Sequence, residues 1–354
     1  MYVPPRPSPQ DDPHYAIRLG LTGALSFAAI PLMDPNMPTI MAALPVGLIA
    51  GQRKAFNPVA IIVAIVVVCV LATLMAWFVN VLQPLPVVYA GAMWLVYFLG
   101  FGMILRSGAA PGMLLVVMAV LFSVIGMSGS AAVAMMRSEF FSAALVALVV
   151  IPLAYMLVPA RTRQVHVAAP VPPGGDAAMG AAIRASVLLA LSFWLYAVMP
   201  PSDIMLAIMA AMVLVFPTRD AVFFEAGQRL RATLYGSALA IVVVAIYPLS
   251  PKLPILLGLV FLAGLWVGTR VLYDPRPHMA YQNALPAALA LIAGGLSTQD
   301  LGQAVLSRVL LTLAGAFTAA YAVALLDSLS GWRTRAEPKI KDGAVRKRAE
   351  PSGS

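Results

Sequence analysis

The sequence predicts an all-α membrane protein with about twelve transmembrane helices, arranged as two parallel six-helix repeats. Composition is the first observation: 61% of the 354 residues are hydrophobic, 10% are charged, and the mean hydropathy is +0.91. A soluble domain of this length cannot expose so much apolar surface, so its solvent is a lipid bilayer. The second observation is a series of apolar runs, most of them near the roughly 20 residues that cross a bilayer.

An internal repeat is the third observation. The segment Ala16-Ile17-Arg18, followed by Ala24-Leu25-Ser26-Phe27, returns at one constant offset as Ala182-Ile183-Arg184, followed by Ala190-Leu191-Ser192-Phe193. The same offset, without a gap, aligns further positions: Arg53 with Arg219, Gly102 with Gly268, Pro111 with Pro277, and Tyr155 with Tyr321. Matches at Arg, Pro, Gly and Tyr along the whole length predict a duplicated unit.

The repeat and the breaks between apolar runs divide the chain into five parts. We expect a disordered, proline-rich cytoplasmic leader over 1–14, a first six-helix repeat over 15–160, a cytoplasmic linker over 161–179, a second repeat over 180–327 and a disordered basic cytoplasmic tail over 328–354. The spans expected in the first repeat are 15–33, 37–51, 58–82, 86–106, 111–128 and 139–158. Those expected in the second are 180–198, 203–216, 230–248, 253–272, 279–296 and 301–326.

The positions of the basic residues predict the orientation. When the loops are assigned alternately to two sides, all but three of the 23 Lys and Arg fall on one side; the three are Arg137, Lys252 and Arg308. Basic loops stay in the cytoplasm, which predicts a multi-pass protein of a bacterial inner membrane with both termini cytoplasmic. Because six spans is an even number, the two repeats share one orientation. The charges flank apolar runs and form no solvated basic face, so we expect no nucleic-acid partner.

Signatures of an enzyme are not found in the sequence. Three histidines, His14, His166 and His278, lie in or beside predicted cytoplasmic loops without metal-ligand spacing, and Cys69 is the single cysteine. There is no glycine-rich phosphate loop after a strand. We therefore expect no catalytic residues, no cofactor and no metal.

The stretch from Phe223 to Gly236 places Arg229 just before the expected third span of its repeat, with Thr233 and Gly236 just inside it. In this motif, in the Ile-Arg that opens each repeat and in the proline-bearing second span, the chain resembles the fusaric acid resistance and aromatic acid exporter family over about 15–326. Two features depart from the family: the first repeat reads Ala-Phe-Asn-Pro over 55–58, and only 161–179 and the tail stand in place of large cytoplasmic domains. The resemblance implies efflux of small aromatic or weak organic acids, with a periplasmic adaptor protein as partner.

Three arginines are candidates for binding the carboxylate of such a substrate. Arg18 and Arg184 lie about one turn inside the predicted cytoplasmic end of the first span of each repeat. Each either holds a carboxylate in two bonds or anchors the helix by reaching lipid phosphates. Arg270 either faces the bundle as a substrate residue or forms a structural ion pair with Asp274.

Polar residues inside the spans are the remaining candidates. Ser26 and Ser192 either line a polar path or bond the carbonyl four residues earlier in their own helix. Gln282 and Asn283 are costlier to bury, and we expect them to face a cavity.

The short second spans, with prolines at or near them in both repeats, mark either a transport site or a tight outer turn. No acidic residue is placed in the middle of the membrane, so Asp34 and Asp203, at the predicted outer ends, are the candidates for coupling transport to protons.

These observations together predict a transporter in which one repeat rocks against the other. An alternative remains open: a non-transporting membrane scaffold or an assembly component of an envelope complex. A homo-oligomer is compatible with either.

Overall fold

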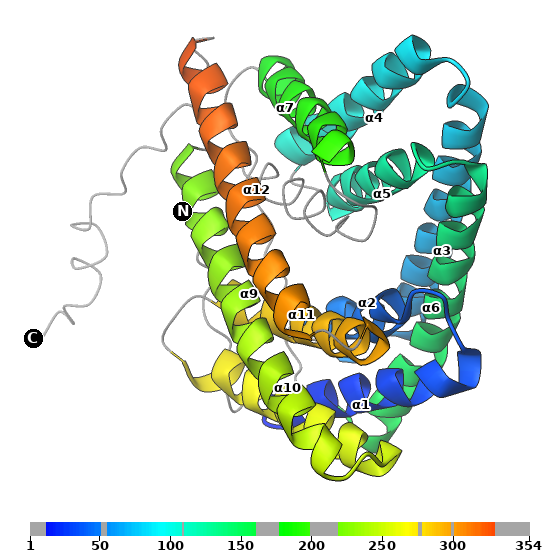
Figure 1. The fold of residues 1–354 in the computed structure, drawn as a ribbon, viewed down its shortest axis with the longest axis vertical. Coiled ribbons are helices and arrows are strands. Elements are labelled where there is room, and N and C mark those ends of the chain that lie inside the picture. Colours follow the sequence, from blue (N-terminus) through cyan, green and yellow to red (C-terminus); the bar gives the residue numbers. More distant parts are fainter. Residues whose placement is uncertain are drawn as a thin grey trace, which may run out of the picture.

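The computed structural model describes residues 12–50, 55–107, 110–160, 177–198, 219–274, 278–298 and 301–329, and every structural statement below concerns these residues. In this part of the chain each regular element is a helix (Figure 1). The α-helices are α1 (Tyr15–Met33), α2 (Pro38–Ala50), α3 (Pro58–Leu82), α4 (Pro86–Ser107), α5 (Ala110–Gly126), α6 (Ser130–Leu157), α7 (Ala177–Val198), α9 (Arg219–Ile246), α10 (Leu253–Tyr273), α11 (His278–Thr298) and α12 (Leu301–Leu329). A short 3₁₀ helix, η3 (Tyr247–Leu249), extends α9.

Seven helices in the described residues are long and apolar enough to cross a membrane: α1, α3, α4, α6, α7, α10 and the stretch Ala226–Leu249 of α9 and η3. Shorter apolar helices are α2, Pro111–Gly126 of α5 and Phe317–Ser328 of α12. The chain is therefore an all-α, multi-pass membrane protein. The predicted span over 203–216 lies outside the described residues, and twelve spans stay a prediction.

The predicted bounds of α1 and α3 are confirmed, whereas α6 and α9 begin much earlier than predicted. α6 begins at Ser130 rather than near 139, directly after Gly129, whose φ of +119° favours glycine. α9 begins at Arg219 rather than near 230. In both cases the predicted span was started at or just after a charged residue, Glu139 in α6 and Arg229 in α9. The helix in fact begins about ten residues before that charged residue. Arg229 is therefore an interior helical residue.

Helices of the two predicted repeats pack on one another reciprocally. α1 packs along α10, and α4 packs along α7. Within each half, α3 contacts α5 and α6, just as α9 contacts α11 and α12. Figure 1 shows the pair α3 and α6 on one side of the molecule, α9 and α12 on the other, α4 and α7 at the top and α1 and α10 at the bottom. Two repeated units related by a two-fold axis would make these contacts, although the repeat itself stays a prediction.

Small residues bring the backbones of α1 and α10 into close contact. A Cβ atom on Gly264 would lie 2.5 Å from the Cα of Gly20, and one on Gly268 would lie 2.5 Å from the Cα of Ala16. Helices in membranes approach this closely where side chains are small. The start of α1 is also held by Tyr15, whose hydroxyl donates to the Ala50 carbonyl of α2 at 2.7 Å. These contacts fix the first turns of α1, which carry Arg18.

Candidate anion site at the start of α1

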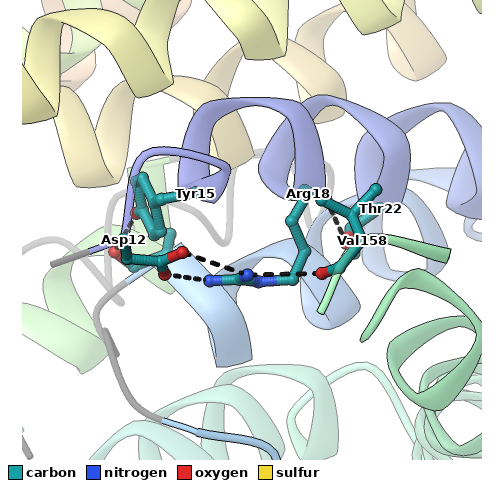
Figure 2. A network of polar contacts seen from close by, with 6 residues as sticks. Asp12, Tyr15, Arg18, Thr22 and Val158 are labelled. Atoms are coloured by element: carbon teal, nitrogen blue, oxygen red, sulfur yellow. Dashed lines mark hydrogen bonds and ion pairs between the residues drawn. The ribbon is translucent and has the colours of Figure 1, made fainter. Parts of the chain in front are cut away.

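Arg18 is fully buried and holds a carboxylate of its own chain. Its Nη2 pairs with Oδ2 of Asp12, while Nη1 lies 3.5 Å from Oδ1 of the same residue and 3.4 Å from the Val158 carbonyl. Figure 2 shows the guanidinium between the Asp12 carboxylate and Val158. The Tyr155 ring lies against it, with 4.5 Å between its centroid and the arginine Cζ. A planar fork that contacts both carboxylate oxygens is the arrangement by which arginine recognises carboxylates.

Three elements build this site. Arg18 comes from the first turns of α1, Asp12 from the turn before that helix, and Tyr155 and Val158 from the end of α6. A cation at the last carbonyls of a helix is favourable because those groups have no partner within the helix and carry partial negative charge. Asp12, within the expected leader over 1–14, is fully buried; the rest of that leader up to residue 11 lies outside the described residues, and its disorder stays a prediction.

Arg184, at the corresponding position of the second predicted repeat, is also fully buried beside a carboxylate. Its Nη1 donates to the Gly180 carbonyl at 3.0 Å, and its Nη2 lies 3.8 Å from Oδ2 of Asp327, near the end of α12. The interpretation of Arg18 and Arg184 as anchors that reach lipid phosphates is wrong, because neither side chain reaches the surface. Their role in substrate binding stays a prediction.

Arg270 forms the ion pair with Asp274 that was its structural alternative, and its role in substrate binding stays a prediction. Its side chain is 52% exposed, lies 3.8 Å from Asp274 and sits over Trp266 at 5.5 Å from the ring centroid. Tyr281 donates to the same Asp274 carboxylate at 2.9 Å and stacks on Tyr235 with 5.2 Å between centroids. Arg270 therefore lies at the rim of an aromatic group shared by α9, α10 and α11, and its side chain does not point into a buried site.

Ser26 and Ser192 are buried and bond the carbonyl four residues earlier in their own helix, at 2.8 and 2.7 Å respectively. The Ser192 side chain also hydrogen-bonds to the hydroxyl of Tyr97. The same tyrosine hydroxyl forms a hydrogen bond of 2.7 Å with the Ser123 hydroxyl. The second serine thus belongs to a buried polar group between α4, α5 and α7. The local hydrogen bonds are those of helix–helix contact residues.

Gln282 and Asn283 are half-buried on α11, which packs along α9. α9 carries three buried side-chain oxygens that make no hydrogen bond among the described residues: Oε1 of Gln228, Oγ1 of Thr233 and Oγ of Ser237. Buried polar groups are seldom left unbonded, so this helix carries unused hydrogen-bonding capacity inside the protein. The sequence motif pointed to Thr233 but not to Ser237.

The coupling candidates are placed differently from each other. Asp34 is exposed at the end of α1, in a left-handed conformation with φ of +44°, and Asp203 lies outside the described residues. Glu139, at the predicted start of the sixth span, is buried in α6. Its Oε1 accepts hydrogen bonds from the backbone N–H and the side-chain amide of Asn36, each at 3.0 Å. It fastens the connection between α1 and α2 to α6.

An apolar pocket adjoins the arginine site. It is a small, partly open hollow of about 70 Å³ between the end of α2, the start of α3 and the second half of α6. The rings of Phe56 and Tyr155 contact each other in its wall with centroids 5.2 Å apart, and Tyr155 also contacts Arg18. In the described part of the chain no group of three or more His, Cys, Asp or Glu could hold a metal ion.

A multi-pass helical membrane protein with buried arginine–carboxylate pairs is the class that these observations define. Residues 189–322 match the family described as fusaric acid resistance protein-like, which confirms the family predicted from the sequence. The match covers just over a third of the chain. It includes Ser192, Arg270, Gln282 and Asn283, whereas Arg18 and Arg184 precede it. Nothing among the curated proteins or the solved structures that were searched matched the chain.

Proposed function

We propose that the protein is an inner-membrane efflux transporter for small aromatic or weak organic acids, working with a periplasmic adaptor protein. The arrangement at Arg18 is the observation that carries this proposal. A buried guanidinium is set among apolar helices, with a tyrosine ring against it and an apolar pocket behind that ring. The guanidinium can bind the carboxylate of an aromatic acid with two hydrogen bonds. The aromatic ring of that acid requires an apolar surface, which the pocket provides. The family match supports transport as the general activity.

In the proposed mechanism the two six-helix units move against each other across two seams, α1 with α10 and α4 with α7. Arg18 lies on the helix that forms the first seam, and its partners Tyr155 and Val158 lie on α6 of the first unit. All three residues belong to the first unit, so the site lies within that unit beside the seam, and a movement at the seam would change how α10 packs against the helix that carries Arg18. Alternating access, in which one site is exposed to each side in turn, requires a movement of this kind.

Energy coupling in this proposal uses a carboxyl group at the predicted outer ends of the helices. Asp34 and Asp203 stay the proposed residues, and Glu139 joins them because it is buried and links α6 to the connection that follows Asp34. Acidic residues buried in membrane helices commonly serve proton relays.

Efflux of radiolabelled benzoate from loaded cells, measured beside membrane abundance, tests the site. Arg18→Ala should abolish export at normal abundance, and Arg18→Lys should restore it only partly because an ammonium lacks the planar two-point grip. Losing one charge-assisted bond corresponds to about 1.5 to 3 kcal/mol, roughly ten- to hundred-fold in affinity. Arg106→Ala, which removes an exposed arginine at the end of α4, is the matched control and should export normally.

Full export by Arg18→Ala, Arg184→Ala and Arg270→Ala would refute the arginine assignment and direct attention to Gln282 and Asn283. A protein that moves no aromatic acid, yet purifies in a stable complex with envelope proteins, would favour the scaffold function instead.

A further inference from the structure

Asp12 occupies the place that a substrate carboxylate would take at Arg18. We propose, on the basis of the function proposed above, that Asp12 is an internal competitor. The turn before α1 closes the anion site with its own carboxylate, and a substrate must displace that carboxylate to bind. The proposal concerns the regulation of this site and follows from how Asp12 and Arg18 are each held.

Asp12 is held by a short turn, not by a helix. The turn lies outside α1, and two backbone bonds join it to the helix: the Tyr15 amide donates to the Asp12 carbonyl at 3.2 Å, and the Arg18 amide donates to the His14 carbonyl at 3.0 Å. A rotation about a few backbone bonds before Tyr15 would withdraw the carboxylate and leave α1 in place. Asp327, which lies beside Arg184, is instead part of the last turn of α12, so its backbone is held by that helix. The two buried pairs therefore differ in how readily their carboxylate can move.

Arg18 keeps its orientation without Asp12. The Tyr155 ring, 4.5 Å from Cζ, belongs to α6, and the Val158 carbonyl, 3.4 Å from Nη1, belongs to the residue that caps the end of that helix; both contact the guanidinium independently of Asp12. A receptor group held in the bound geometry loses little freedom when a ligand arrives. The fork is thus preorganised to receive a carboxylate from another source.

We expect the Asp12 carboxylate to be exchanged for another carboxylate at Arg18, and not simply to leave the site. An arginine left buried without an anion is strongly unfavourable. Asp12 therefore leaves when another carboxylate takes its place or when water enters the site. The apparent affinity for a substrate is lowered by the fraction of molecules in which Asp12 covers the arginine. Removing the aspartate charge abolishes this competition.

The test uses the full chain with benzoate as the probe. Asp12→Asn keeps the shape of the side chain but cannot form the ion pair, so it should lower the KM for benzoate efflux about tenfold or more. In purified protein it should increase the thermal stabilisation produced by a fixed benzoate concentration. Asp11→Asn removes the same charge one residue earlier and should behave as the parent protein. Arg18→Ala should abolish both responses, with or without Asp12→Asn.

An unchanged KM together with unchanged benzoate stabilisation in Asp12→Asn would overturn the proposal and leave Asp12 a structural partner. Should that variant be poorly produced, a reporter in the protein with Asp12 intact decides the question. In the double variant His14→Cys, Cys69→Ala, the new thiol should react with a maleimide several-fold faster when benzoate is present, and an unchanged rate would refute displacement.

The failure of this proposal can be told apart from the failure of the proposed function. If the parent protein exports benzoate and Asp12→Asn has the same KM, the internal competition is refuted while transport stands. If the parent exports no benzoate but Asp12→Asn binds it more tightly through Arg18, the competition stands while transport of this acid is refuted.

Discussion

Gly264 offers a direct test of the contact between α1 and α10. In Gly264→Ala the new methyl carbon would lie 2.5 Å from the Cα and 3.1 Å from the backbone nitrogen of Gly20. Carbon atoms in contact normally lie about 3.5 to 4.0 Å apart, so the helices must separate by roughly 1 Å. Overpacking costs about 1 to 3 kcal/mol, and the upper part of this range applies because a backbone cannot rotate away. Alanine regains about 1 kcal/mol of helix propensity, leaving a net loss of about 1 to 2 kcal/mol.

Gly258→Ala is the matched control, because it lies on the same helix and a Cβ atom there would meet nothing within 4 Å. We expect this variant to be at least as stable as the parent. Thermal unfolding of both purified variants in detergent, together with membrane abundance, measures the difference. Equal stability of the two variants would show that α1 and α10 do not approach each other as described.

Three further predictions concern the buried polar groups and the topology. Thr233→Val should leave the thermal stability unchanged or slightly higher, because the threonine hydroxyl has no hydrogen-bond partner to lose. A large loss of stability would show that the hydroxyl does have such a partner. Glu139→Gln should retain the acceptor for Asn36 and remain stable, whereas Glu139→Ala should lose about 1 to 3 kcal/mol, and equal stability of the two would show that these hydrogen bonds contribute little. Reporter fusions should read cytoplasmic after Arg161 and periplasmic after Lys252, and a periplasmic signal after Arg161 would refute the parallel repeats.

Hydrophobic runs bounded by proline and polar breaks were sufficient to predict several helices. Span 58–82 was predicted to the residue, since Pro58 opens the helix and Asn57 caps it by accepting from the Ala60 amide. The same reasoning placed α6 and α9 too late. It treated Glu139 and Arg229 as marks of a helix end, whereas tertiary contacts bury both side chains inside the helices.

The partners of Arg18 and Arg184 could not be predicted, because neither the internal repeat nor the order of the apolar runs indicates which carboxylate pairs with which arginine. Asp327 comes from α12, far in sequence from Arg184. Asp12 belongs to a segment whose proline content indicated disorder, so a carboxylate six positions before Arg18 was not considered as its ligand. Identification of Arg18 and Arg184 as candidates depended on the repeat, which the alignment of Arg, Pro, Gly and Tyr positions made visible.

The packing of α1 on α10 has a consequence for how the chain is made. α1 leaves the ribosome well before α10, the helix that packs on its glycine face and begins only at Leu253. At about 5 to 20 residues per second this interval is on the order of 10 to 50 s. During that time the face that will contact α10 must be covered by lipid or by a membrane insertion factor. A chain interrupted before α10 would therefore reach the bilayer with its first helix unassembled, which makes it a substrate for membrane proteases.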